Sequence, residues 1–214
     1  FDGLLTVFAD TETGYANLTK LVSRADPGPA EAQEPHVAMA DIEALREGLI
    51  VLTGGARGPI DRVIDGQQVP LARERLERLA GLFPERLYVE IQRHGAPSEA
   101  VVEPVLLDLA YAMKLPLVAT NECFFATPDD YEAHDALICI AEGTYVAEDK
   151  RRRYTAGHYF KSQEEMARLF ADLPEALANT IEIAKRCHVR PRGRKPILPR
   201  FVSTADGASD ADQL

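Results

Sequence analysis

Glu90 and His94 are the residues whose types and spacing best suit chemistry. They stand in the stretch Glu90-Ile91-Gln92-Arg93-His94, at the end of a short apolar run. Alternation along a strand sends Glu90, Gln92 and, by extension, His94 to one face. A carboxylate beside an imidazole can bind a divalent metal or transfer a proton. Because no third ligand stands nearby, we favour a polar network over a metal or acid–base site.

Two neighbouring apolar runs also end in candidate groups. Glu122 follows the run Leu115–Thr120 and could ligate a metal or act as a base. Cys123 has no adjacent His or Lys to stabilise a thiolate, so we interpret it as a small apolar filler. The glycines in Thr53–Gly58 could let backbone amides approach a phosphate. The P-loop spacing and its Lys are absent, however, so a tight turn is the favoured interpretation.

The remaining histidines and the cysteines are weaker candidates. His134 and Asp135 stand together in a helical pattern, where packing and capping of the strand ends is the expected role. His36, His158 and His188 have no carboxylate or histidine at ligand spacing, so we expect them in loops or at helix ends. The 3 cysteines lack CxxC spacing, which argues against a structural zinc site and favours a reducing cytosol.

Two basic clusters are candidate contacts for DNA or another subunit. They comprise Arg151, Arg152 and Arg153, and then Arg190, Arg192, Arg194 and Lys195. Arginines of a larger complex commonly contact phosphates. The net charge of the chain is −10, however, whereas domains that bind DNA by themselves are usually basic. We therefore favour solvated charged faces, on a domain that does not bind DNA alone.

The elements that position these residues are short apolar runs followed by amphipathic patterns. Nearly continuous apolar runs predict buried strands at Leu4–Ala9, Leu49–Gly54, Arg86–Gln92 and Leu115–Thr120. Helical patterns follow at Thr13–Ala25, Val69–Phe83 and Val102–Lys114, and Pro104 fits only in a first turn. This order predicts an α/β fold with a parallel sheet, whose active groups gather at the carboxyl ends of the strands. So few units cannot close a barrel, so we expect further units upstream and a chain that is a fragment.

After Thr127 the pattern becomes helical. Helices are predicted at Pro128–Glu142, Ser162–Ala171 and Pro174–Cys187, the second of them behind a capping box of Ser162 and Glu165. Prolines in Asp26–Pro35 predict a surface loop, and we expect the acidic tail from Val202 to be disordered. No apolar run approaches the roughly 20 residues of a membrane span, and no signal peptide is recognisable. We therefore expect no membrane partner and a cytoplasmic location.

Segments spread along the chain resemble the alpha subunit of bacterial DNA polymerase III. They are Glu12–Leu18 (ETGYANL), Glu47–Gly55 (EGLIVLTGG), Leu87–Gly95 (LYVEIQRHG), Leu115–Glu122 (LPLVATNE), Tyr131–Asp135 (YEAHD) and Leu173–Thr180 (LPEALANT). Any one of these motifs is weak evidence. All of them in the same order and spacing, across residues 1–201, are specific.

The resemblance implies a PHP domain (polymerase and histidinol phosphatase), which is a distorted seven-stranded βα barrel. The expected fold class is α/β, with an incomplete barrel that lacks its N-terminal strands, followed by an all-helical segment leading toward the palm. Residues 1–190 would form the C-terminal three quarters of the PHP domain. Residues 191–214 would begin the linker to the palm, and Lys195–Phe201 is similar to that junction.

For relatives with an intact site, the resemblance implies a cluster of His, Asp, Glu and Cys ligands that binds metal and hydrolyses DNA from the 3′ end. Here a ligand His corresponds to Leu4 and a ligand Cys to Gly55. An Asp-x-His pair corresponds to Glu122-Cys123-Phe124, so the carboxylate survives and the imidazole does not. One carboxylate cannot supply the roughly four to six donors that a metal needs.

We therefore expect no catalytic residue, metal or cofactor within this chain, and a residual polar site of Glu90, His94 and Glu122. The resemblance implies a parent protein that is a DNA-directed DNA polymerase, with magnesium held by paired aspartates in its palm. The implied partners are a proofreading exonuclease subunit, docked by this metal-free domain, and, through the parent, the sliding clamp, the clamp loader and primer–template DNA. The fragment alone is expected to be inactive.

Two alternatives stay open at this point. One is a metal-dependent PHP phosphoesterase or 3′–5′ exonuclease, which would need the His-rich cluster that Leu4, Gly55 and Phe124 interrupt. The other is an interaction module with no polymerase parent.

Overall fold

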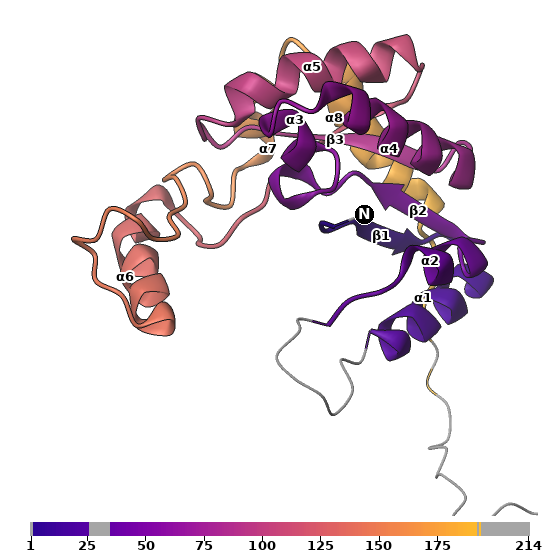
Figure 1. The fold of residues 1–214 in the computed structure, drawn as a ribbon, viewed down its shortest axis with the longest axis horizontal. Helices are drawn as coiled ribbons and strands as arrows, with labels where there is room; N and C mark the ends of the chain where they lie inside the picture. The colour runs from indigo at the N-terminus through magenta and orange to yellow at the C-terminus, as the bar shows by residue number, and fades with distance from the viewer. Residues whose placement is uncertain (1, 26–34, 192, 194–214) are drawn as a thin grey trace, which may run out of the picture.

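The computed structural model describes residues 2–25, 35–191 and 193 (Figure 1). The strands are β1 (Thr6–Ala9), β2 (Leu49–Leu52), β3 (Leu87–Gln92) and β4 (Leu117–Thr120). The α-helices are α1 (Glu12–Arg24), α2 (Met39–Ala44), α3 (Asp61–Asp65), α4 (Val69–Leu82), α5 (Glu99–Ala112), α6 (Tyr131–Glu142), α7 (Gln163–Leu169) and α8 (Pro174–Arg186). Two 3₁₀ helices are η1 (Gly55–Arg57) and η2 (Pro128–Asp130). The described chain is thus a mixed α/β fold, as predicted.

The strands form one sheet in the order β1-β2-β3-β4. As predicted, β2, β3 and β4 are parallel, with Leu52 paired to Tyr88 and Gln92 to Thr120. β1 runs antiparallel to β2, so the prediction of an all-parallel sheet is wrong. The prediction that β1 is buried is also wrong, because its residues alternate between exposed and half-buried. An apolar run indicates a tendency to be buried and carries no information about the direction of pairing.

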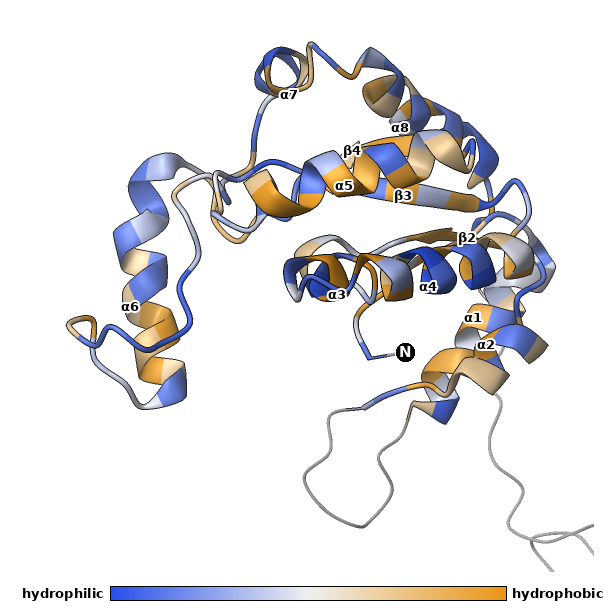
Figure 2. Cartoon of the chain, turned by 45° about the horizontal axis from the view of Figure 1, so that its top comes forward, coloured by the Kyte–Doolittle hydropathy of each residue, from blue (hydrophilic) through white to orange (hydrophobic). Residues whose placement is uncertain are grey.

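Helices cover both faces of the sheet. On one face, Val51 and Val89 belong to the larger core together with Leu76 of α4 and Leu106 of α5. On the other face, residues of the strands pack with α8 in a smaller core of Ile50, Leu52, Tyr88, Val118 and Ile183. In Figure 2 apolar residues run along β2 and much of β3, while α4, α5 and α8 mix apolar and polar positions. Burial of both faces explains why these strands show no polar alternation.

The helices begin and end close to the predicted bounds, with one exception and two omissions. The exception is α5, which begins at Glu99, so Pro104 lies inside the helix and not in its first turn as predicted. Proline there removes one backbone hydrogen bond of the helix. The omitted helices are α2 and α3, which have 6 and 5 residues and are too short to show a helical period. The capping box of Ser162 and Glu165 at the start of α7 is confirmed.

The segment between β4 and α7 forms an arm that leaves the body of the fold. Figures 1 and 2 both show α6 standing apart from the sheet and from the helices that cover it. Among the described residues, none of the helices is both long and apolar enough to cross a membrane. The predicted loop at Asp26–Pro35, apart from Pro35, and the predicted disordered tail lie outside the described residues.

Candidate functional site at the carboxyl ends of the strands

Glu90 lies at the centre of a polar network that joins the ends of β2, β3 and β4. One carboxylate oxygen accepts hydrogen bonds from the Thr120 hydroxyl (2.6 Å) and from Nε2 of Gln92 (3.2 Å). The other accepts the backbone N–H of Gly54 at 2.9 Å. The side chain is buried, with the residue 4% exposed. The predicted polar network is therefore confirmed for Glu90 and Gln92, and both oxygens of the Glu90 carboxylate accept hydrogen bonds.

The glycines after β2 form the predicted tight turn. Gly54 has φ of 89° and Gly55 has φ of 56°, in the left-handed region that glycine adopts without strain. A Cβ at Gly55 would lie 2.3 Å from Oε1 of Gln92. The Gln92 side chain therefore occupies the space into which a residue larger than glycine would project.

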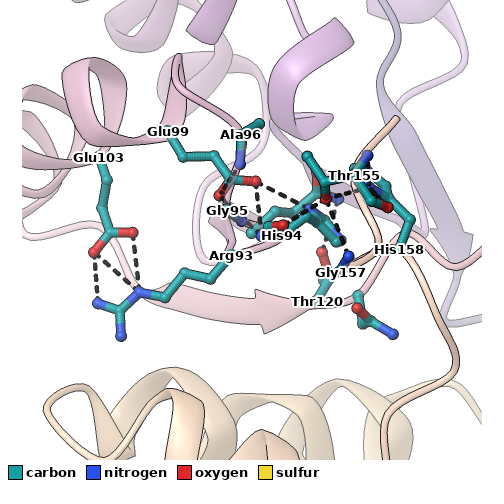
Figure 3. A network of polar contacts seen from close by, with 12 residues as sticks. Arg93, His94, Gly95, Ala96, Glu99, Glu103, Thr120, Thr155, Gly157 and His158 are labelled. Carbon is teal, nitrogen blue, oxygen red and sulfur yellow. Dashed lines mark hydrogen bonds and ion pairs between the residues drawn. The ribbon is translucent and has the colours of Figure 1, made fainter. Parts of the chain in front are cut away.

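His94 faces Glu99, and not Glu90 as predicted from strand alternation (Figure 3). Its Nδ1 lies 3.1 Å from Oε1 of Glu99, and a carboxylate only accepts, so the proton is on Nδ1. Nε2 of His94 is buried and has no hydrogen-bond partner. β3 ends at Gln92, so the chain turns before His94 and the alternation of the strand no longer applies.

Glu99, at the first position of α5, ties down the turn that follows β3. Its carboxylate accepts the backbone N–H groups of His94 (2.8 Å), Gly95 (2.8 Å) and Ala96 (3.2 Å). Burial works to raise the pKa of Glu99, but hydrogen bonds from the ring and backbone of His94 outweigh it and hold the pKa below its ordinary value. Sequence reasoning missed Glu99, although an acidic residue at a helix start after a glycine turn is a recognisable signal.

His158 stacks on His94, which contradicts its interpretation as a loop residue without a partner. The two ring centroids are 4.0 Å apart and the rings are 9° from parallel. Nδ1 of His158 accepts the backbone N–H of Thr155 at 3.2 Å, while the Thr155 hydroxyl donates to the carbonyl of His94 at 2.5 Å. Burial and the neighbouring His94 lower the pKa of His158. No local signal links residues this far apart in the sequence.

The fit of the segment 155–160 against β3 also depends on Gly157. A Cβ at Gly157 would lie 2.2 Å from the carbonyl oxygen of His94. Glycine is therefore required for the backbones to approach this closely.

We expect the segment 155–160 to loosen as pH falls from 7 to 5. The folded state disfavours a charged His158, whereas the unfolded segment takes up a proton near its ordinary pKa of about 6.5. Stability is therefore lost as pH falls through this range and is retained above it. Hydrogen exchange of peptides covering 155–160, corrected for intrinsic rates, measures the effect. His158→Phe keeps a ring for stacking and should remove the pH dependence; an unchanged dependence would contradict the prediction.

Glu122 is paired with an arginine. One of its carboxylate oxygens accepts a hydrogen bond from Arg57 at 2.8 Å. The Glu122 charge also acts to raise the pKa of His158, against the stronger effects of burial and His94, so the carboxylate lies on the side of the histidine pair. Of the predicted residual site, His94 thus contacts His158, Glu122 is paired with Arg57, and Glu90 belongs to the separate network around Thr120.

Leu4 and Phe124 occupy positions where the resemblance implies imidazole ligands. Leu4 precedes β1, is 50% exposed, and its backbone N–H donates to the carbonyl of Arg57 at 2.9 Å. Phe124 packs on Tyr154 and on His158, with ring centroids 4.2 Å and 5.6 Å apart. It also stacks with His134, so this histidine packs against aromatic rings, consistent with its predicted packing role.

The metal cluster that the PHP family implies does not fit the residues present. Leu4, Gly55 and Phe124 supply no donor, and the guanidinium of Arg57 already neutralises Glu122. Both carboxylate oxygens of Glu90 already accept hydrogen bonds within the chain. Within residues 2–25, 35–191 and 193, no group of three or more His, Cys, Asp or Glu is arranged to hold a metal ion. We therefore derive no chemical step through a metal in this domain.

The first basic cluster is less available than its sequence suggests. The Arg151 side chain is only 2% exposed, because its guanidinium forms a two-point ion pair with Asp135, both bonds 2.5 Å long. Arg151 is therefore wrong as a candidate DNA or subunit contact. Arg152 pairs with Glu142, and Arg153 donates to backbone carbonyls, but both residues are exposed. Arg192, Arg194 and Lys195 lie outside the described residues.

Several known proteins are similar to this chain. Residues 2–94 match the family model of the PHP domain. The DNA polymerase III subunit alpha of Caulobacter vibrioides (strain NA1000 / CB15N) is 47% identical over 210 residues, which cover 98% of this chain and 18% of the relative. The subunit alpha of Escherichia coli (strain K12) is 41% identical over 207 residues, or 94% of this chain and 18% of the relative. That of Pseudomonas aeruginosa (strain PAO1) is 39% identical over 218 residues, again 18% of the relative.

Residues 2–94, which contain β1, β2 and β3, thus resemble a PHP domain. Over nearly its whole length, the chain is similar to alpha subunits of DNA polymerase III. It spans about 18% of the length of the curated relatives that it matches.

Proposed function

We propose that this chain is the PHP-domain part of the catalytic alpha subunit of a replicative DNA polymerase, and that the domain is a metal-free scaffold. The observation that carries the proposal is the state of the ligand positions, where Leu4, Gly55 and Phe124 replace donors and Arg57 neutralises the remaining Glu122. A nuclease site would need several donors at this place. The similarity to alpha subunits over nearly the whole chain supports the choice of parent.

The parent protein carries out template-directed DNA synthesis in the cytoplasm. Its palm holds magnesium through paired aspartates and contacts primer–template DNA, and it joins the sliding clamp and the clamp loader. The palm follows residue 214, residues 191–214 begin the linker to it, and residues 1–190 form most of the PHP domain. Strands that precede residue 1 complete the barrel beside β1. The chain alone polymerises nothing.

As a scaffold, the domain docks the separate proofreading exonuclease subunit. Support comes from the way the strand ends are closed by contacts within the chain. Glu90 and Glu99 bind backbone N–H groups, and His94 and His158 stack on each other, so these side chains hold loops together. Because the polar groups at the strand ends bind one another, this part of the domain keeps a fixed shape, and a docking partner requires a fixed surface.

Cross-linking of the full-length alpha subunit with its exonuclease subunit tests this role. The domain offers exposed lysines for an amine-reactive reagent at Lys20, Lys114, Lys150 and Lys185. We expect mass spectrometry to find cross-links between several of these and the exonuclease. An unrelated protein of similar size, in place of the exonuclease, controls for chance encounters. Cross-links confined to lysines outside this segment would contradict the docking role.

A further inference from the structure

A small acidic cavity lies between α3 and α5, beside the end of β3. Its volume is about 190 Å³. Five carboxyl groups line it, those of Asp61, Asp65, Glu90, Glu99 and Glu103. The one arginine in its lining, Arg62, is half exposed and pairs with Asp2 at 3.1 Å. The cavity therefore has an excess of negative charge.

Three of these carboxylates already have donors within the fold. Glu90 and Glu99 are bound as described above, and Glu103 accepts two hydrogen bonds from Nε of Arg93, at 3.1 and 3.0 Å. Asp61 differs, because it is only 9% exposed and its Oδ1 has no hydrogen-bond partner. A buried carboxylate oxygen without a donor destabilises the folded state, and more so when the group is charged. Oδ1 of Asp61 is therefore a buried carboxylate oxygen in this cavity without a donor, whereas Asp65 is exposed to solvent.

The rest of the lining restricts what that partner can be. Ile91, Val102 and Leu106 add apolar surface to the lining of the cavity, beside the carboxyl groups. No group of three or more metal-ligating side chains exists among the described residues, so a metal ion is disfavoured. A group that combines positive charge, N–H donors and a short apolar stem matches both parts of this lining.

We propose that this cavity binds a primary alkylammonium group, with Asp61 as its counter-ion and the apolar part of the lining in contact with its alkyl chain. Burial, and then the charge of Glu90, raises the pKa of Asp61 to about 7, so the free cavity holds a proton near neutrality and the ammonium binds in its place. The group belongs either to a free amine or to a lysine side chain of a partner protein. The proposal is independent of the scaffold role.

Saturation-transfer NMR with the full-length alpha subunit tests the proposal, because it detects weak ligands of large proteins. The probe is n-butylammonium at pH 8, and n-butanol is the neutral control of the same shape. We expect transfer to the ammonium and not to the alcohol, with affinity reduced about tenfold in Asp61→Asn, since a charge-assisted hydrogen bond is lost. Asp108→Asn, an exposed aspartate on α5 outside the cavity, should bind as the native protein does.

A second variant keeps the test valid if Asp61→Asn alters the fold. Ala56→Leu narrows the cavity from its exposed rim and should also abolish transfer. Putrescine and Nα-acetyl-lysine amide then distinguish the two sources. Tighter binding of putrescine would indicate a free amine, and tighter binding of the lysine amide would indicate a lysine side chain. Equal binding of butanol and butylammonium, unchanged binding to Asp61→Asn, or no transfer to any of these amines would overturn the proposal.

Discussion

Arg93→Met is expected to destabilise the junction of β3, α5 and the α7–α8 turn by about 2–3 kcal/mol, because it leaves the largely buried Glu103 carboxylate without its counter-charge, whereas solvent screens the exposed Asp172. Arg93 donates to Glu103, to the carbonyl of Leu169 (2.7 Å) and to both oxygens of Asp172 (2.7 and 2.8 Å). Its guanidinium also lies over the Phe170 ring, 4.8 Å from the centroid. The hydrogen bonds to Asp172 and Glu103 raise the pKa of Arg93, so it stays charged throughout the accessible pH range.

The position of Arg93 makes this loss large. Its side chain is 17% exposed, so solvent screens the ion pairs only partly. Methionine retains the packing of the aliphatic stem, which isolates the electrostatic contribution. Hydrogen exchange in the full-length subunit, followed over 99–112 and 163–186, measures local opening. Lys185→Met removes the exposed pair with Glu182 and should cost at most about 1 kcal/mol. Equal losses of stability in Arg93→Met and Lys185→Met would contradict the prediction, because the Arg93 cluster would then contribute no more than an exposed ion pair.

Asp61→Asn is expected to stabilise the region around α3 at pH 8, by on the order of 4 kcal/mol. Burial raises the folded pKa of Asp61 to about 7 from its ordinary value of 3.8. Each pKa unit between the folded and unfolded states corresponds to about 1.4 kcal/mol. The rise from 3.8 to about 7 means that an ionised Asp61 at pH 8 opposes folding by about 4 kcal/mol. Asparagine has nearly the same shape and carries no charge.

The sign of the pH dependence makes this prediction specific. The folded protein holds the Asp61 proton more tightly than the unfolded chain does, so stability is full below about pH 4 and falls as pH rises to about 7. Above pH 7 it is constant. Hydrogen exchange of peptides covering 55–66, corrected for intrinsic rates, should show this decline in the native protein and not in Asp61→Asn. Asp65→Asn, an exposed position on the same helix, is the matched control; parallel pH profiles for native protein and Asp61→Asn would contradict the account.

The sequence predicted the strands and long helices because their apolar residues report burial directly. β2, β3 and β4 are buried as their continuous runs indicated, and α1, α4 and α8 lie within a residue or so of their predicted bounds. The direction of β1 was missed because pairing depends on the path of the chain between strands. α3 was missed because it is short, and Asp61 was therefore not considered.

The site was only partly predictable, since most of its contacts join distant residues. Glu90 and Gln92 are two positions apart on one strand, so alternation predicted their contact correctly. His158 meets His94 only because the arm returns to the end of β3. Arg151 looked like part of a basic surface because its partner, Asp135, lies 16 positions earlier. Burial of a charge by a partner cannot be seen in a local charge pattern.

The metal content and nuclease activity of the full-length alpha subunit, purified without its exonuclease subunit, test the central claim most directly. After dialysis, elemental analysis should find no stoichiometric zinc or manganese, and labelled DNA should keep its 3′ ends with either metal added. We expect this result because the residues that this chain places at the strand ends supply too few donors to hold a metal ion. One or more zinc or manganese ions per chain, together with 3′-exonuclease activity that Glu122→Gln abolishes, would contradict the metal-free scaffold.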